Sequence, residues 1–291
     1  MEYTKPSAVI LTKNRNHHWF FIHELSKVLD IKCIIIENKP NQSLFKKIQK
    51  HGFRWTILKA ISKISSNTTN KIDKQFLKFQ NTFDPEKTKA KFQELVLDTS
   101  DINSKKVKEK LKSISPRYLC SLGGGIIDSE GISYADLALN FHGGLSPFFN
   151  GADVMEKVFE SRNLNLVGGT LMLMTEKIDA GPILGHFLPE INEDDDLESL
   201  YVKNIIGGVK LYVDFIFTNE SSAIDLTELK RQKKPLHYYL GYDHSIFTDT
   251  VIKYFNDNSL IKNFLRKEKT FQYYKKELDF NELLQSLNII K

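Results

Sequence analysis

The run Ala8-Val9-Ile10-Leu11-Thr12 decides the fold of this chain. A short continuous apolar run is typical of a parallel strand that is buried on both faces of a sheet. Residues 19–29 then carry apolar side chains at helical spacing, and residues 32–36 form a second buried run. Because a strand, a helix and a strand in this order form a right-handed crossover, the sequence predicts a parallel sheet.

The same patterns return along the chain and predict an α/β fold. This fold would be a Rossmann-like, mostly parallel sheet with helices on both faces, plus a small C-terminal appendage. We expect one main domain over 1–219 with a Lys-rich, mostly helical insertion at about 41–115, and a small region over 220–291. Further strands are expected at 118–122, 137–141, 170–174 and 182–187, helices at 153–161, 194–217 and 248–265, and part of a hairpin at Tyr238–Tyr242.

Composition indicates a globular intracellular protein. The apolar share of 41% and the aromatic share of 11% suit a sizeable core. Cys33 and Cys120 both lie in apolar runs, so we interpret them as small buried side chains without a disulfide framework. No signal peptide and no apolar stretch of about 20 residues is found, so we expect a cytoplasmic protein without a membrane partner.

Positive charge is concentrated in one segment. The formal net charge is +5, but residues 41–118 carry +11 and the remainder carries −6. Such a segment can bind phosphates or nucleic acid, or it can be the solvated face of amphipathic helices. Its lysines are spread out, with little arginine and little aromatic interleaving. We therefore favour the solvated face and do not expect nucleic acid among the partners.

Two motifs carry groups suited to chemistry. The stretch N-F-H-G-G-L-S-P-F-F-N-G covers Asn140 to Gly151, and a strand through it would project Asn140 and His142 to the same side. The stretch from Gly168 to Leu184 presents Asp179 in a loop after a strand. Each residue alone also fits a structural role, such as a turn, because single polar residues beside glycines often stabilise turns.

Together, the two motifs resemble the signature of the formyltransferase family, which includes glycinamide ribonucleotide formyltransferase, methionyl-tRNA formyltransferase and the sugar N-formyltransferases. The resemblance covers residues 118–217 clearly, and residues 8–36 by pattern only. It implies catalysis by Asn140, His142 and Asp179 with N10-formyltetrahydrofolate as cosubstrate and without a metal. The matching positions, in order, are Asn140, His142, Leu145, Pro147, Gly151, Gly168, Thr170, Asp179 and Gly181.

The expected reaction explains these residue types. An amine attacks the formyl carbon and gives an oxyanionic intermediate. His142 can exchange protons near neutral pH, and the Asn140 amide can donate a hydrogen bond to the oxyanion. Asp179 can fix the His142 tautomer, stabilise the imidazolium, or relay a proton through water.

The resemblance also implies residues that contact the ligands. Glycines in these loops permit close approach of a ligand to the backbone. For Arg15 and His17, a solvated loop competes with contact to a substrate phosphate. The folate is expected at Ser121, Leu122, Gly123, Gly124, Gly125, Ile126, Thr175 and Ile178, and the second substrate at Arg15, His17, Gly143, Gly144 and Ser146.

Two departures bear on the acceptor. Met172 stands where the glycinamide enzymes and many sugar enzymes carry His, and the turn after the first strand lacks the Gly-rich phosphate loop of the glycinamide enzymes. Residues 220–291 lack the regular strand spacing of the barrel that methionyl-tRNA enzymes append. A nucleotide-linked amino sugar is therefore our first expectation. Met172 and the basic segment support methionyl-tRNA formyltransferase as the alternative.

Other functions stay open at this level. A formyl-folate hydrolase would use the same three residues with water as the acceptor. A binding module without activity would keep the fold but has no need of all three polar groups. The sequence leaves open the sugar, its nucleotide, the position of the amine and the oligomeric state, with which a homodimer is compatible.

Overall fold

The described residues of the computed structural model form one mixed sheet of eight strands in the order β10-β8-β7-β5-β4-β1-β2-β3. These strands are β1 (Ser7–Thr12), β2 (Asp30–Glu37), β3 (Val96–Thr99), β4 (Tyr118–Leu122), β5 (Leu137–His142), β7 (Gly169–Leu173), β8 (Ile183–Leu188) and β10 (Tyr273–Lys275). The model describes residues 4–38, 48–49, 52–54, 56–57, 68–222, 229, 232, 234–235, 237–239, 246–257, 260–266 and 273–275.

The strands β3, β2, β1, β4 and β5 are parallel, whereas β7, β8 and β10 are antiparallel to their neighbours. Two short strands, β6 (Phe149–Gly151) and β9 (His237–Tyr239), form a separate parallel pair. The helices are α1 (Asn16–Leu25), α4 (Thr68–Phe79), α5 (Pro85–Phe92), α6 (Lys105–Ile114), α7 (Ser129–Ser133), α8 (Val154–Glu160), α9 (Leu197–Ser222), α10 (Ile246–Asp257) and α11 (Leu260–Leu265). The predicted α/β class is confirmed.

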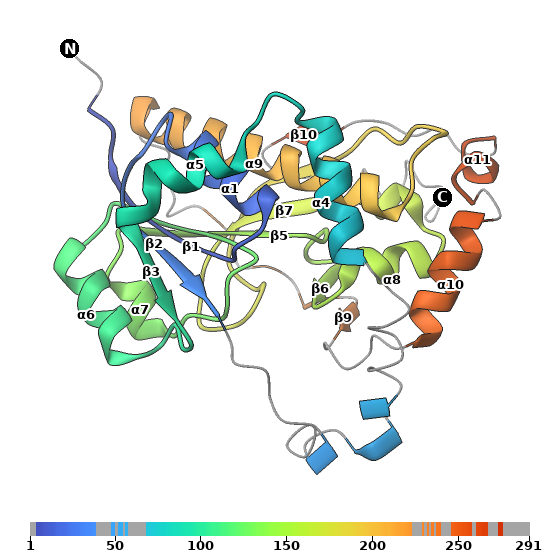
Figure 1. Ribbon diagram of the computed structural model, residues 1–291, viewed down its shortest axis with the longest axis horizontal. Helices are drawn as coiled ribbons and strands as arrows, with labels where there is room; N and C mark the ends of the chain where they lie inside the picture. Colours follow the sequence, from blue (N-terminus) through green and yellow to red (C-terminus); the bar gives the residue numbers. More distant parts are fainter. Residues whose placement is uncertain are drawn as a thin grey trace.

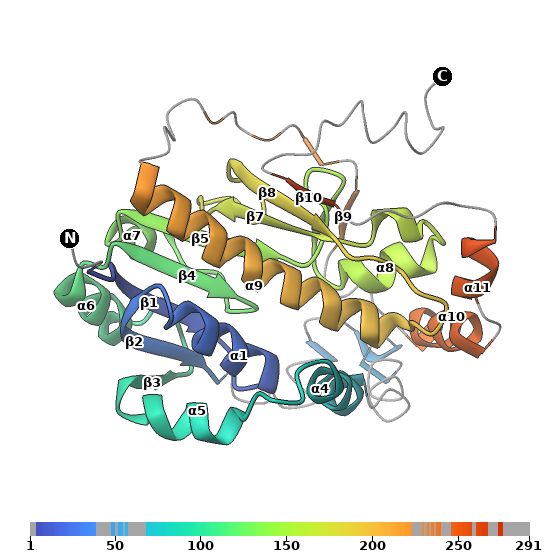
Figure 2. The same cartoon turned by 90° about the horizontal axis from the view of Figure 1, so that it is seen from above.

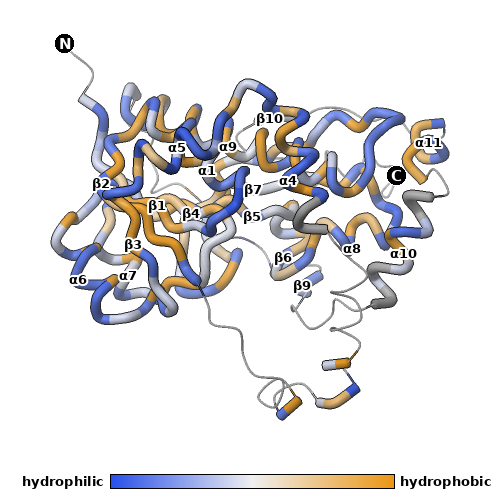
Figure 3. The backbone as a smooth tube through the Cα atoms, in the orientation of Figure 1, coloured by the Kyte–Doolittle hydropathy of each residue, from blue (hydrophilic) through white to orange (hydrophobic). Residues whose placement is uncertain are grey.

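Helices cover both faces of the sheet, as predicted. Figures 1 and 2 show α1 and α9 side by side over one face, and Figure 1 shows α6 and α7 on the other. The side chains of β1 alternate accordingly, since Ala8 and Ile10 pack under α1 and α9, while Val9 and Leu11 pack with α6. The strands β1 and β2 are apolar in Figure 3, which agrees with burial on both faces.

Helix α9 packs directly on the sheet because it lacks side chains at two positions. A Cβ atom added at Gly207 would lie 2.2 Å from the Phe187 ring, and one at Gly208 would lie 2.4 Å from the Phe141 ring. Farther along α9, the Tyr212 hydroxyl lies 2.6 Å from the carbonyl oxygen of Ser121 and 2.9 Å from that of Leu139. These contacts fix α9 over β4 and β5.

The structure adds a strand to the segment that the sequence predicts to be mostly helical. Residues 43–114 are not wholly helical, because Val96–Thr99 form the edge strand β3. This strand is only half-buried and contains Asp98, so its apolar pattern is weak. Of the segment Tyr238–Tyr242, which the sequence predicts to be part of a hairpin, residues 240–242 lie outside the described residues; the described strand β9 pairs in parallel with β6.

The described part of the C-terminal region contacts the main domain. Helix α10 packs on α8, β9 pairs with β6, and β10 adds to the sheet beside β8. Among the described helices, none combines the length and apolar character that crossing a bilayer demands.

The close packing of α9 generates a prediction. Replacing Gly208 with Ala forces a methyl group against the Phe141 ring, and overpacking of this kind typically costs roughly 1–3 kcal/mol. The better helix propensity of Ala offsets up to about 1 kcal/mol of that cost. We expect Gly208→Ala to lower the urea midpoint of unfolding, whereas Gly143→Ala, which meets open space, should not. Equal midpoints for the two variants would contradict this packing.

A buried histidine on β8 makes stability depend on pH. His186 is 2% exposed, its Nε2 atom lies 2.7 Å from the Ser146 carbonyl oxygen, and burial lowers its pKa to about 4. The unfolded chain binds a proton near pH 6.5, so the stabilisation is complete above that pH and is lost as the pH falls toward 4.

We expect His186→Gln, which cannot titrate, to show a shallower loss of unfolding free energy between pH 6.5 and 4. The difference in slope should approach about 1.4 kcal/mol per pH unit. Urea unfolding of the wild type and of His186→Gln across this pH range measures the difference in slope. The other histidines contribute equally to the two proteins, so the difference reports His186. Identical slopes would show that His186 protonates freely in the folded state.

Candidate active site

Strand β5 presents Asn140 and His142 on the face of the sheet that α9 does not cover. The side chains of Leu139 and Phe141 belong to the core beneath α1 and α9. The side chain of Ala138 belongs to the core on the other face of the sheet. Because side chains alternate along a strand, Asn140 and His142 project to the same side as Ala138. The predicted common orientation of the two polar residues is therefore confirmed.

His142 is held between two acceptor atoms. Its Nε2 atom lies 3.0 Å from the carbonyl oxygen of Phe149, so Nε2 carries the proton of this hydrogen bond. Its Nδ1 atom lies 3.3 Å from the Oδ2 atom of Asp179, and both side chains are more than nine-tenths buried. The ring makes both hydrogen bonds at once only as the doubly protonated imidazolium. Asp179 therefore lies within direct reach of His142, which is one of the two arrangements, direct or through one water, that the sequence leaves open.

Asp179 is fixed by the β6 strand. The backbone N–H of Gly151 donates to Asp179 Oδ2 at 3.0 Å, and the side-chain amide of Asn150 donates to the Asp179 carbonyl at 2.7 Å. Asp179 has φ of 50°, in the left-handed region that costs a residue other than glycine free energy. The contacts from Asn150 and Gly151 offset this cost and aim the carboxylate at His142.

A cavity of about 130 Å³ lies on this face of the sheet, and both Asn140 and Asp179 line it. Six of the eight residues predicted to contact the folate line it. His142 is not a lining residue and lies behind Asp179. The lining residues are Ser121, Gly124, Gly125, Ile126, Ile127, Ile132, Asn140, Met172, Leu173, Met174, Thr175, Lys177, Ile178 and Asp179.

Glycine backbone and aliphatic side chains form part of the cavity wall. Gly124 and Gly125 contribute backbone to its wall, and a Cβ atom at Gly125 would lie 2.4 Å from the Glu37 carboxylate. Ile126 and Ile178 are exposed aliphatic side chains on its rim. Within the described residues, no hydrogen bond engages the side-chain amide of Asn140, so this amide is available to a ligand in the cavity.

Other predicted ligand contacts are placed away from the cavity. Leu122 is buried in the core under α1, and Gly123 lies against His18, with φ of 64°. Gly143 has open space where a Cβ would be, and a Cβ at Gly144 would lie 2.8 Å from His142 Nε2. Ser146 is fully buried, and its N–H donates to Thr170 Oγ1.

Arg15 and His17 lie beside an acidic group from the Lys-rich segment. Asp73 of α4 lies 3.8 Å from Arg15 Nη1 and 3.9 Å from His17 Nδ1. Burial and the nearby Arg15 charge lower the pKa of His17 to about 4. His17 is therefore neutral at pH 7 and could give a phosphate a hydrogen bond but no positive charge, whereas Arg15 keeps its charge.

Sequence reasoning missed the residues that hold His142 and Asp179, the catalytic pair, in place. Asn150 is the second-last residue of the quoted motif and is 2% exposed, yet its role depends on a loop 29 residues later. The Phe149 contact uses a carbonyl oxygen, which every residue has, so no side-chain pattern indicates it. Among the described residues, no cluster of three His, Cys, Asp or Glu side chains could hold a metal.

The chain is similar in sequence to curated proteins of two kinds. Formyltetrahydrofolate deformylase 2 of Arabidopsis thaliana is 25% identical over 178 residues, which is 60% of this chain and 43% of that protein. A methionyl-tRNA formyltransferase of Hydrogenobaculum is 31% identical over 120 residues, 40% of this chain and 39% of that protein. The chain thus spans less than half the length of these curated relatives.

A solved N-formyltransferase from Helicobacter canadensis, in complex with folinic acid and dTDP-3-aminofucose, shares the fold. The two structures superpose with a TM-score of 0.50 at 16% identity, over 83% of this chain and 73% of that one. The family model described as formyl transferase matches residues 34–237, which include both motifs and all three candidate catalytic residues. The chain belongs to the formyl transferase family.

Proposed function

We propose that the protein transfers a formyl group from N10-formyltetrahydrofolate to the primary amine of a nucleotide-linked amino sugar. One observation carries the formyl-transfer part of this proposal. The carboxylate of Asp179 lies 3.3 Å from His142 Nδ1, and Asp179 and Asn140 both line one cavity. This arrangement provides a proton acceptor, its orienting carboxylate and an oxyanion donor around one space.

The folate supplies the one-carbon unit, and the cavity beside Ser121 and Ile126 is our proposed place for it. Its apolar sides would pack on the faces of the pteridine, and its backbone edges would bind the polar rim. The Helicobacter canadensis enzyme was solved in complex with folinic acid, a formyl-folate, which supports this choice of donor.

Asn140 would stabilise the charge that develops on the formyl oxygen as the amine adds to the carbonyl carbon. Its amide has no hydrogen-bond partner among the described residues, so it would not have to break an existing contact to donate. A preorganised donor of this kind is typically worth about 10²–10³ in rate.

His142 and Asp179 would move the protons together. Asp179 faces the cavity and His142 does not line it, so a proton leaving the amine reaches His142 past the carboxylate or through a water beside it. The imidazolium that results is stabilised because it donates hydrogen bonds to the Phe149 carbonyl oxygen and to Asp179 Oδ2. The stored proton can then return to the folate nitrogen as it departs.

The amino-sugar acceptor rests on weaker support than the donor. The dTDP-3-aminofucose in the Helicobacter canadensis complex is one nucleotide-linked amino sugar, and Arg15 offers a charge to a diphosphate here. Methionyl-tRNA is the second candidate, because the Hydrogenobaculum relative carries that name. Water is the third, because the Arabidopsis relative is named a deformylase. A cytoplasmic location and a homodimer stay predictions from the sequence.

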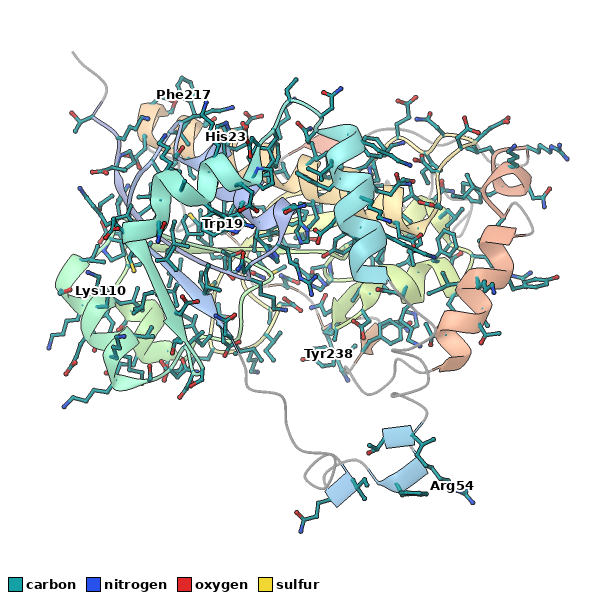
Figure 4. The ribbon with its side chains drawn as sticks, in the orientation of Figure 1. Trp19, His23, Arg54, Lys110, Phe217 and Tyr238 are labelled. Carbon is teal, nitrogen blue, oxygen red and sulfur yellow. The ribbon has the colours of Figure 1, made fainter. Side chains whose placement is uncertain are left out.

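Variants of the three residues test the chemistry. We expect His142→Ala to fold but to lose about 10²–10⁴ in kcat, the usual contribution of general acid–base catalysis. Asn140→Ala should lose about 10²–10³ through the missing oxyanion donor. His23→Ala is the matched control, because His23 is a partly exposed histidine on α1 (Figure 4). Turnover of His142→Ala equal to that of the control would remove His142 from the mechanism.

An acceptor screen tests the substrate class. The wild-type protein, formyl-folate and a panel of nucleotide-linked 3-amino and 4-amino deoxysugars are incubated, and mass spectrometry detects the gain of one formyl group. Initiator methionyl-tRNA and water alone are run in parallel, at low and high salt. We expect transfer to a panel member with weak salt dependence, because a diphosphate offers few contacts. Formylation of the tRNA alone, falling steeply with salt, would replace the amino-sugar assignment.

A further inference from the structure

Strand β6 has two edges, and each edge binds a different part of the molecule. The backbone groups of the odd-numbered residues face the catalytic pair, since Phe149 O accepts from His142 and Gly151 N donates to Asp179. The even-numbered residues face β9, since His237 N donates to Phe148 O and Ala152 N donates to Tyr239 O, both at 2.9 Å. The strand therefore lies between the pair and the C-terminal region.

Aromatic rings reinforce this pairing. The rings of Phe149, His237 and Tyr239 are nearly parallel, with interplanar angles of 12–16° and centroid distances of 5.4–6.4 Å. Cross-strand aromatic contacts of this kind stabilise a strand pair. A Cβ atom at Gly151 would lie 2.0 Å from Tyr239 O, so the two backbones approach as closely as a glycine allows.

A second contact reaches the loop that carries Asp179. The side-chain amide of Gln232 donates to the carbonyl oxygen of Gly181, two residues after Asp179, and lies 3.6 Å from the sulfur of Met172. The C-terminal region thus contacts β6, which bonds to His142 and Asp179, and the loop that carries Asp179. Asp179 has an unfavourable backbone conformation, so its geometry depends on such external contacts.

We propose that Gln232, His237 and Tyr239 form a C-terminal clamp that positions His142 and Asp179 for proton transfer. The clamp residues are positioning residues, because they act through Phe149, Gly151 and Gly181. The expected effect of the clamp on kcat rests on the proposed function. None of the clamp residues lines the cavity, so loss of the clamp should lower kcat and leave the KM for the folate nearly unchanged.

The sharpest test removes one hydrogen bond of the strand pair. His237→Pro deletes the N–H that donates to Phe148 O. Tyr238→Pro is the matched control: successive N–H groups of a strand point to opposite edges, so the Tyr238 N–H points away from β6, and this residue is 45% exposed (Figure 4). His237→Phe keeps both the N–H and a ring for the stack.

We expect His237→Pro to lower kcat by about 10- to 100-fold, the scale of a small misplacement of catalytic groups. Tyr238→Pro and His237→Phe should stay within about threefold of wild type, a difference of less than 1 kcal/mol. Far-UV circular dichroism and the thermal midpoint show whether each variant folds. Should His237→Pro not fold, Gln232→Ala is the second variant, with kcat expected to fall at unchanged folate KM.

A spectroscopic arm makes the test independent of the acceptor. Two-bond ¹H–¹⁵N spectra of histidine-labelled protein report which ring nitrogen of His142 carries the proton, and His142→Ala assigns its signals. The wild type should show a fixed proton on Nε2, and His237→Pro should lose it. A wild type that formylates no amine would refute the proposed function while this spectrum still decides the clamp. An unchanged His142 signal with unchanged kcat in His237→Pro would overturn the clamp.

Discussion

The alternation of side chains along β5 is the constraint on which the site depends. Leu139 and Phe141 must point into the core under α9, and the Phe141 ring fits against the bare backbone of Gly208. Asn140, which lies between them, and His142, which follows them, therefore point to the opposite face, where the cavity lies. A shift of β5 by one residue in its register would turn Asn140 and His142 toward α9 and would turn Leu139 and Phe141 toward the opposite face. The hydrophobic core thus selects the face on which chemistry can occur.

The loop after β5 is fixed by the same core. Thr170 Oγ1 donates to Gly144 O and accepts from Ser146 N, while the Asn204 amide of α9 donates to Gly168 O. These bonds satisfy buried backbone groups that would otherwise cost free energy. They also bring the segment 149–151 to the place where it meets Asp179. The site is held mainly by backbone groups, and the Asn140 side chain makes no hydrogen bond among the described residues.

Much of the fold and the central residues could be predicted from the sequence. The buried runs at 8–12 and 118–122 are long enough to stand out, and the spacing of Asn140 and His142 indicates their common face without a structure. The strand β3 escaped prediction because an edge strand buries one face weakly. The supports of the pair escaped because they are carbonyls and N–H groups, brought together by tertiary pairing, and such groups have no signature of their own.

The pairing of β6 with β9 joins residues that lie almost ninety positions apart in the chain. The sheet from β1 to β8 and the long helix α9 are complete in sequence before β9 begins. Contacts of such long range close late in folding, because the entropy of closing a large loop must first be offset. During synthesis, the strands from β1 to β8 and helix α9 therefore emerge before β9, which pairs with the strand that contacts His142 and Asp179. Under the proposed clamp, the catalytic pair would reach its final geometry only after the C-terminal region has been synthesised and has paired with β6.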